Sequence, residues 1–252
     1  MKFFIIKKQH IMLALCVIIT TALIVTGSVS IFANQNRKLP IYCVKTDKKQ
    51  VAISFDAAWG NDDTQTLIDI LKEYDVPATF FVVGAWVDKY PESVKALHDA
   101  GHRIENHSNT HPHMPQLSTE QMKNELESCN NKIKAITGRC PTLLRVPYGD
   151  YDNAVLETTE ALGMYTIQWD VDSLDWKDHA TADSICKRVT SKVKNGSIVL
   201  FHNDAEHTPE ALPNILKCLK DDGYEFVFIE DLIYKENYEI IHDGTQCKIE
   251  NN

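Results

Sequence analysis

The chain has 252 residues, of which 44% are apolar and 24% are charged, a composition that excludes a largely disordered protein. The first 38 residues contain five basic residues and no acidic ones, which leaves 21 basic and 35 acidic residues, a formal net charge of −14, in the remainder. Because phosphate binding needs a basic surface, we expect no nucleic-acid partner.

The N-terminal segment is predicted to be a membrane anchor. Residues 11–32 contain no charged side chain and follow Lys2, Lys7 and Lys8. A stretch of this length can span a bilayer, and lysines ahead of it stay in the cytoplasm. We therefore expect residues 1–33 to form a single-pass anchor, residues 34–39 a linker, and residues 40–252 an extracytoplasmic domain. A cleaved signal that releases a secreted protein is the alternative.

Strand-like and helix-like segments alternate along the rest of the chain. Seven short apolar segments are predicted strands: Val51–Phe55, Ala78–Val83, Arg103–Glu105, Leu143–Val146, Tyr165–Trp169, Ser197–Phe201 and Glu225–Ile229. Six segments have helical periodicity: Thr64–Tyr74, Pro91–Ala100, Ser118–Ile136, Asn153–Leu162, Ala182–Val193 and Pro209–Asp222. This alternation predicts an α/β fold with parallel strands, either a barrel or an open doubly wound sheet. In both architectures, the barrel and the open sheet, functional groups lie at the carboxyl ends of the strands.

Four polar side chains lie at or near the ends of predicted strands. Asp56, His107, Arg145 and His202 span more than 140 positions of the sequence. Because parallel strands share one carboxyl rim, we expect these side chains to converge there. A proline before Tyr148 and a glycine after it predict a rigid turn that holds Arg145 and the Tyr148 amide at the same rim.

Two of the histidines have the spacing of a metal-binding pair. His107 and His111 are four residues apart, which would put both imidazoles on the same side of one helical turn. Surface or packing histidines are the alternative interpretation of such a pair. Because Asp56 ends an equivalent strand, we favour the metal-binding interpretation.

Acidic and aromatic side chains lie together in residues 169–176. Asp172 and Asp175 lie between Trp169 and Trp176. An indole face can pack against the apolar face of a sugar ring, so the segment favours a carbohydrate cleft over a loop of solvated acids.

Five motifs in this order resemble those of the NodB-type polysaccharide deacetylases of carbohydrate esterase family 4. They are Ser54-Phe55-Asp56, His107-Ser108-Asn109-Thr110-His111, Arg145-Val146-Pro147-Tyr148, Asp172-Ser173-Leu174-Asp175-Trp176 and Leu200-Phe201-His202. The resemblance covers residues 41–231 and implies a distorted (β/α)7 barrel, in agreement with the seven predicted strands. It also implies removal of acetyl groups from N-acetylated sugars of an extracytoplasmic glycan such as peptidoglycan or a chitin-like polymer. Residues 40–43 and 55–60 further resemble the branch associated with endospore formation in Firmicutes.

The resemblance assigns roles to individual residues. Asp56 matches the general base and Arg145 the residue that orients it, while the Tyr148 amide would stabilise the oxyanion. His202 would protonate the leaving amine, held by Asp175 as first choice and Asp172 as second.

The resemblance also implies a divalent metal ion and a saccharide cleft. His107 and His111 would bind the ion, which would be zinc first, with cobalt, manganese or another first-row metal as alternatives. Trp59, Tyr148 and Trp176 are assigned to substrate binding.

One position departs from the family pattern. Family members usually have two consecutive aspartates where this chain has Asp56 and Ala57. Ala57 replaces the carboxylate that would join the two histidines on the metal, so we predict Asp62 or Asp63 as a substitute ligand. An ion held weakly by the two histidines and water is the alternative. A catalytically silent glycan-binding or morphogenetic protein on the same fold is therefore the main rival function. A glycosidase with paired carboxylates is a weaker rival because it leaves the histidine pair unexplained.

Overall fold

The computed structural model describes residues 37–249, and the compact unit that contains the predicted domain begins at Leu39. The predicted anchor, residues 1–33, lies outside the described residues and stays a prediction. Within residues 37–249, no helix is long and apolar enough to cross a membrane.

The described body alternates strands and helices. Its strands are β1 (Cys43–Val44), β2 (Gln50–Ala57), β3 (Ala78–Val82), β4 (Arg103–Asn106), β5 (Leu143–Leu144), β6 (Tyr165–Thr166), β7 (Val171–Asp172), β8 (Ser197–His202), β9 (Glu225–Phe226), β10 (Tyr238–Ile240) and β11 (Thr245–Lys248). Its helices are α2 (Thr64–Glu73), α3 (Gly84–Lys89), α4 (Pro91–Asp99), α5 (Thr119–Thr137), α6 (Asn153–Ala161), α7 (Ala182–Thr190), α8 (Thr208–Asp221) and α9 (Ile229–Leu232), with short 3₁₀ turns η1 (Met114–Gln116) and η2 (Pro147–Gly149).

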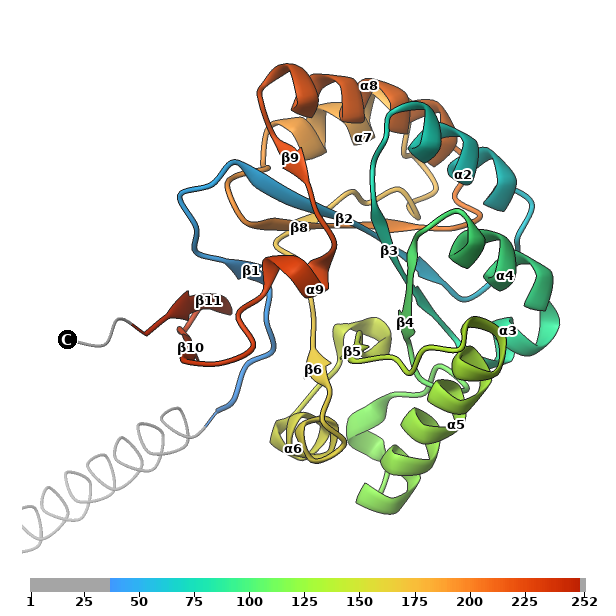
Figure 1. Ribbon diagram of the computed structural model, residues 1–252, viewed down its shortest axis with the longest axis vertical. Helices are drawn as coiled ribbons and strands as arrows, with labels where there is room; N and C mark the ends of the chain where they lie inside the picture. The colour runs from blue at the N-terminus through green and yellow to red at the C-terminus, as the bar shows by residue number, and fades with distance from the viewer. Residues whose placement is uncertain (1–36, 250–252) are drawn as a thin grey trace, which may run out of the picture. The chain divides into compact units, whose positions relative to one another are not determined.

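One curved sheet carries all of these strands. The strand order is β10-β11-β1-β8-β2-β3-β4-β5-β6, with β7 paired to β8 and β9 paired to β2. Strands β2 to β6 and β8 pair in parallel. Helices α7, α8, α2, α4, α5 and α6 pack next to one another in this order outside the sheet (Figure 1). A bridge between Ile41 and Ile167 joins the chain just before β1 to the residue after β6, so the sheet approaches closure as a distorted barrel.

The predicted α/β fold is confirmed, and each of the seven predicted strands overlaps an observed one. Three of them end two or three residues earlier than expected, and the one predicted over Leu143–Val146 ends at Leu144. The strand predicted over Glu225–Ile229 ends at Phe226 and is followed by α9, while that predicted over Tyr165–Trp169 ends at Thr166. The six predicted helices are observed within a few residues of their expected bounds. The sequence pattern did not reveal β1, β7, β10, β11, α3 or α9 because each is only two to six residues long.

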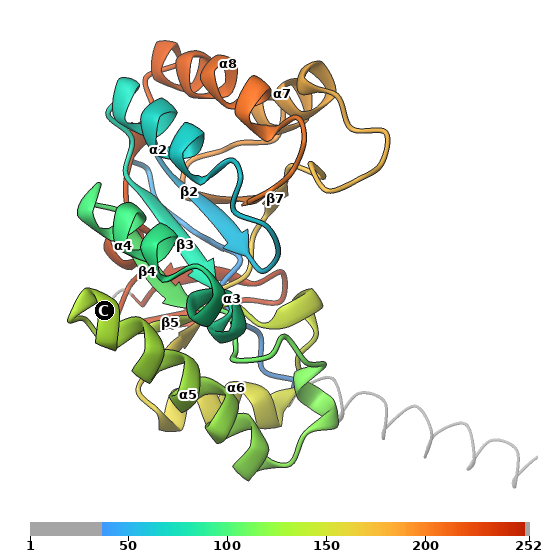
Figure 2. The same cartoon turned by 90° about the vertical axis from the view of Figure 1, so that its right-hand side faces the viewer.

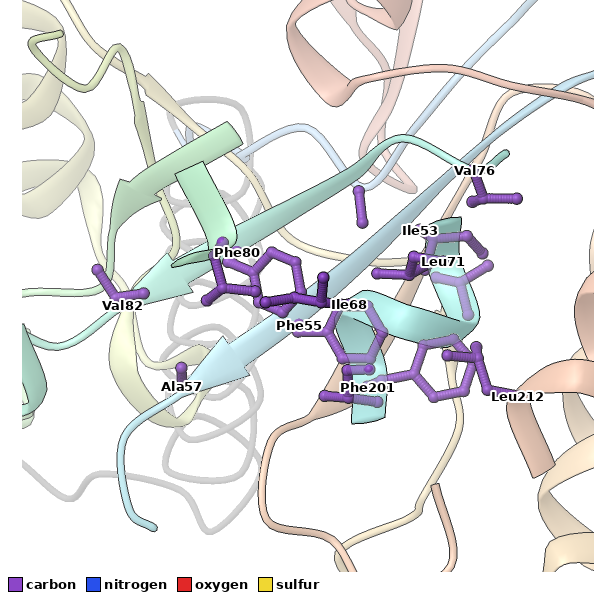
Figure 3. Close-up of a cluster of buried hydrophobic side chains, with 14 of the residues drawn as sticks. Ile53, Phe55, Ala57, Ile68, Leu71, Val76, Phe80, Val82, Phe201 and Leu212 are labelled. Carbon is purple, nitrogen blue, oxygen red and sulfur yellow. The ribbon is translucent and has the colours of Figure 1, made fainter. Parts of the chain in front are cut away.

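Strand β2 separates an apolar core from the polar residues of the site. Its alternate residues Ile53, Phe55 and Ala57 belong to the core cluster that packs against the helices (Figure 3). The Phe55 ring stacks on Phe80 of β3 at 4.7 Å between centroids and on Phe201 of β8 at 5.5 Å. This packing fixes β2, β3 and β8 in register. Because successive strand residues point to opposite faces, Asp56 points away from this cluster.

Candidate active site

Asp56 and Arg145 form a buried ion pair at the centre of the site. Arg145 is fully buried, and its Nη1 donates to Asp56 Oδ1 at 2.8 Å. Its Nη2 donates to Ser54 Oγ at 2.9 Å and to the Gln168 carbonyl at 3.2 Å. Burial is the largest single influence and acts to raise the pKa of Asp56, but the charge and hydrogen bond of Arg145, together with His107 and His202, keep the pKa below its ordinary value. Asp56 is therefore held as a carboxylate, as the sequence interpretation of Arg145 requires.

His107 presents one ring nitrogen to this carboxylate. Its Nδ1 lies 2.7 Å from the Arg145 carbonyl oxygen, which can only accept a hydrogen bond, so Nδ1 carries the proton. The other nitrogen, Nε2, then has a free lone pair and lies 3.6 Å from Asp56 Oδ2. Burial lowers the pKa of His107, which keeps the ring neutral and suited to bind a metal.

His111 lies beside His107, but not on a helical turn. The ring centroids are 4.9 Å apart. The predicted helical turn is wrong, because residues 107–111 form a loop in which Ser108 and His111 have left-handed backbones with φ of 67° and 60°. Burial, and then the proximity of His107, lowers the pKa of His111 to about 4. Its Nδ1 is buried without a hydrogen-bond partner in the described body.

The loop between these histidines is fixed by Glu125 of α5, a residue that the sequence interpretation missed. Its Oε2 accepts the Asn109 and Thr110 backbone N–H groups at 2.8 and 2.7 Å, and its Oε1 accepts the Thr110 hydroxyl at 2.9 Å. Charged acceptors form strong hydrogen bonds to backbone amides. Glu125 therefore holds the loop that places His111 next to His107.

Replacing Glu125 with glutamine should weaken metal binding. The amide keeps the size of the side chain but loses the charge; when its oxygen accepts both backbone N–H groups, its nitrogen cannot accept the Thr110 hydroxyl. By analogy with groups that orient metal-binding histidines, we expect about a 10–100-fold loss of metal affinity, measured by titration of the metal-free protein with Zn²⁺. The matched control is Glu127→Gln, an exposed neighbour on the same helix. Equal affinities of the two variants would contradict this role for Glu125.

The donor set fits a metal ion held by two imidazoles. His107 Nε2 has a free lone pair, and the buried Nδ1 of His111 lacks a partner. In the described part of the chain, no group of three or more His, Cys, Asp and Glu side chains is arranged to hold a metal. The structure thus gives no support to Asp62 or Asp63 as the substitute ligand. Asp63 precedes α2, and its Oδ2 instead accepts the Asp204 backbone N–H at 2.9 Å.

Ala57 is buried on the core side of β2, with 1% of its surface exposed. The Ala57 carbonyl accepts a hydrogen bond from the Val83 backbone N–H at 3.0 Å. The adjacent Val82 carbonyl accepts one from the His107 backbone N–H at 3.1 Å. The backbone of position 57 is therefore tied closely to the strand that leads to the histidine loop. Its methyl group supplies no metal ligand.

His202 is paired with Asp175, the first-choice partner. His202 on β8 lies directly opposite Asp56 on β2 in the parallel pairing of these two strands. Its Nδ1–H donates to Asp175 Oδ1 at 2.8 Å, and its backbone N–H donates to Oδ2 at 2.8 Å. Burial acts to lower the pKa of His202, but the hydrogen bond and charge of Asp175, with smaller contributions from Asp56 and Asp172, raise it above its ordinary value. Asp172, the second choice, instead accepts the Leu174 backbone N–H at 2.8 Å.

Exposed aromatic side chains surround His111. Trp59 and Tyr148 are 68% and 60% exposed, and their ring centroids lie 5.7 and 4.5 Å from that of His111. Tyr148 has a left-handed backbone, with φ of 59°, and its ring stacks on His113 at 4.3 Å. His113 in turn pairs with Asp150 at 3.0 Å. The two predicted substrate-binding aromatics thus lie beside the histidine pair. The third, Trp176, follows Asp175 and lines a separate pocket.

Comparisons with known proteins identify the family of this chain. The family model described as polysaccharide deacetylase matches residues 44–167. Peptidoglycan-N-acetylmuramic acid deacetylase PdaA of Bacillus subtilis is 34% identical over 198 residues, which cover 77% of this chain and 75% of PdaA. The uncharacterized protein YlxY of the same organism is 34% identical over 194 residues, which cover 77% of this chain and 60% of YlxY. The matched part of this chain thus spans less than two thirds of YlxY.

The similar solved structures include a relative described as a pseudoenzyme. Wild-type BA3943 of Bacillus anthracis, described as a pseudoenzyme of carbohydrate esterase family 4, has a TM-score of 0.74 and 36% identity, covering 77% of this chain and 68% of that one. A BA3943 mutant, described as having restored enzymatic activity, has the same TM-score and 37% identity, with 77% and 70% coverage. The shared fold, the five ordered motifs and the identity to PdaA show that this chain belongs to the polysaccharide deacetylase family.

Proposed function

We propose that the protein is a metal-dependent hydrolase that removes acetyl groups from N-acetylated sugars of peptidoglycan outside the cytoplasm. The observation that carries the proposal is the convergence of three pairs at the carboxyl ends of the strands: Asp56 with Arg145, His107 with His111, and His202 with Asp175. Asp56 contacts His107 and lies opposite His202 in the strand register, so the three pairs share one site. The activity in the name of PdaA supports peptidoglycan as the substrate.

Asp56 is suited to accept a proton from the attacking water. An acetamide is a poor electrophile, so its hydrolysis needs an activated water, a polarised carbonyl and a protonated leaving nitrogen. Oδ1 of Asp56 is bound to Arg145, which leaves Oδ2, on the side of His107, to take the proton. The Tyr148 backbone N–H would stabilise the negative charge that develops on the carbonyl oxygen.

His202 is suited to donate the proton to the leaving amine. Its Nδ1 is bound to Asp175, so Nε2 is the nitrogen that can reach the substrate. The carboxylate of Asp175 stabilises the imidazolium form, which is the form that can act as an acid. A divalent ion bound by His107 and His111 would supply Lewis acidity, polarising the acetyl carbonyl and lowering the pKa of water.

The test of this function is the release of acetate from N-acetylated peptidoglycan and from chitin oligomers. The metal-free protein should release little acetate, and added Zn²⁺, Co²⁺ or Mn²⁺ should each be assayed for restored release. If no metal supports release from either substrate, the enzymatic proposal fails. Release from chitin oligomers alone would contradict peptidoglycan as the substrate.

A catalytically silent glycan-binding protein is the second candidate, and Ala57 is the observation that favours it. Position 57 supplies no carboxylate to the histidine pair, and the described residues form no three-ligand group. A metal held by two imidazoles should bind more weakly than one with an added anionic ligand. The similarity to BA3943 shows that this fold is also found in a protein described as a pseudoenzyme.

Replacing Ala57 with aspartate decides between these candidates. Because Ala57 is buried on the core side of β2, an unpaired carboxylate there should lower the melting temperature of the metal-free protein. An ion bound by His107 and His111 offsets that cost only where the new carboxylate turns from the core to the histidine pair; Zn²⁺ should then bind more tightly and raise the melting temperature by more than in the wild type. If acetate release appears only in Ala57→Asp, the natural chain is silent. If Zn²⁺ affinity does not rise, Ala57 is not the position of the missing ligand.

We also propose that residues 1–33 tether the domain to the outer face of the cell membrane and that the protein acts during spore formation. The uncharged segment behind three lysines supports the tether, and the resemblance of residues 40–43 and 55–60 supports the sporulation role. A mature form beginning near Asn34 in the culture medium would contradict the tether. Unchanged spore peptidoglycan after deletion of the gene would contradict the role in sporulation.

A further inference from the structure

A pocket separate from the proposed catalytic residues lies beside the segment that carries Asp175. The connection from β7 to α7 projects from the body (Figure 2). It forms one wall of a pocket of about 570 Å³, and α7 forms the other. This volume lies within the ordinary range of small-ligand sites. The lining includes Leu174, Trp176, Lys177, Ser184 and Arg188, but none of the residues assigned above to proton transfer or metal binding.

The pocket and the proposed active site share the short segment 173–175. Asp175 is turned toward His202, whereas Ser173 and Leu174 line the pocket. Leu174 has a left-handed backbone, with φ of 58°, and its N–H donates to Asp172 Oδ1 at 2.8 Å. A ligand in the pocket would thus contact the residue next to the carboxylate that holds His202. This position suits a part of the substrate beyond the sugar that is deacetylated.

Arg188 gives the pocket its chemical character. Its Nε donates to the Asp172 carbonyl at 2.6 Å, which fixes the guanidinium against the loop. Arg103, Arg139 and Arg145 each pair with a carboxylate, whereas Arg188 forms no ion pair with any residue between 37 and 249. A half-buried guanidinium offers two parallel donors that match a carboxylate.

The remaining lining suits the apolar part of such a ligand. Trp176 is 57% exposed, and Leu174 and Ala180 provide further apolar surface. Lys177 adds a second cation, 5.6 Å from the Trp176 ring centroid. Asp178 is the acidic residue of the lining. The pocket therefore combines an aromatic platform with two cations.

We propose that this pocket binds a carboxylate-bearing arm of the glycan, either its attached peptide or an acidic sugar substituent. The inference rests on the proposed function, and it predicts that the protein selects acidic peptidoglycan over neutral chitin-like polymers. Arg188 receives the carboxylate, Trp176 packs against the apolar part of the arm, and the N-acetyl group lies on the Asp175 side of segment 173–175.

The test measures binding by calorimetry with the purified full-length chain. The probes are N-acetylmuramyl dipeptide, its amidated form, N-acetylmuramic acid and chitotetraose. The wild type should bind the free dipeptide more tightly than the amidated one. Tight binding of N-acetylmuramic acid would assign the carboxylate to the sugar substituent, whereas weak binding would assign it to the peptide.

The matched variants are Arg188→Gln and Lys187→Gln. Lys187 is the exposed neighbour of Arg188 on α7 and does not line the pocket. Arg188→Gln should lower the affinity for the muramyl dipeptide about tenfold, the loss expected for one charge-assisted hydrogen bond, and Lys187→Gln should not. Arg188→Lys should recover part of the affinity because it keeps the charge. Thermal unfolding of each variant checks that the loop is still folded.

The binding result separates this inference from the enzymatic proposal. If the muramyl dipeptide binds through Arg188 but no acetate is released, the pocket assignment stands and the enzymatic function fails. If Arg188→Gln and Lys187→Gln have the same affinity for the muramyl dipeptide and also the same affinity for N-acetylmuramic acid, the pocket assignment is wrong whatever the activity.

Discussion

Replacing His107 and His111 together with alanine is expected to abolish metal binding and acetate release. The two rings are the donor pair proposed for the metal, and between residues 37 and 249 no group of three or more His, Cys, Asp and Glu side chains is arranged to hold one. Loss of a group that only orients a metal ligand already lowers metal affinity by up to about 100-fold, so loss of both ligands should lower it further. Titration with Zn²⁺ and an acetate assay should show both losses together.

The control for the double variant is His242→Ala, since His242 is an exposed histidine between β10 and β11. It should keep wild-type metal affinity and rate. Circular dichroism should show that the double variant is folded. Full metal occupancy in the folded double variant would contradict the assignment of the histidine pair as metal ligands. Loss of the metal with unchanged acetate release would show that the reaction does not need the metal.

Replacing Asp175 with asparagine should produce the second large effect. In the wild type, Asp175 outweighs burial and raises the pKa of His202, so the imidazolium persists to higher pH. In the variant burial dominates and the pKa falls, so the acid form is lost at lower pH. The high-pH limb of the rate profile should therefore move to lower pH. At a fixed pH above that limb, kcat should fall by about 10²–10⁴-fold, the usual contribution of a general acid.

The measurement for this variant is kcat against pH, with Asp183→Asn as the control. Asp183 is an exposed carboxylate at the start of α7 and should leave the profile unchanged. Asp175 also accepts the Thr208 hydroxyl at 2.7 Å, so the unfolding temperature of Asp175→Asn must be measured alongside. A folded variant with the wild-type profile would contradict the role of Asp175 as the partner that keeps His202 protonated.

The parts of the site that follow from strand periodicity were predictable from the sequence. Asp56 and His202 each lie at the end of an apolar segment that the sequence identifies as a strand. The parallel pairing of these two strands then places the two residues side by side. The pairing of His202 with Asp175 was expected from the family resemblance, which left Asp172 as the second choice. Arg145 was expected at the rim, but its complete burial beneath Asp56 is visible only in the structure.

The parts that depend on loop conformation were not predictable. The spacing of His107 and His111 predicted a helical turn, yet left-handed residues at 108 and 111 produce the same proximity by another route. Glu125 lies 14 residues after His111 on a helix whose pattern gives no sign that one acid points inward to a loop. The pocket of Arg188 likewise depends on the conformation of the loop residues 173–180 against α7, which hydrophobic periodicity does not predict.

The central claim is that Asp56, at the end of β2, performs metal-dependent deacetylation. The most direct test is the rate of acetate release from N-acetylated peptidoglycan by the metal-loaded wild type and by Asp56→Asn, measured side by side. Asparagine keeps the shape of the side chain but cannot accept the proton, so the rate should fall by about 10²–10⁴-fold while bound metal is retained. Equal rates for the two proteins, or no release by the metal-loaded wild type, would contradict the claim.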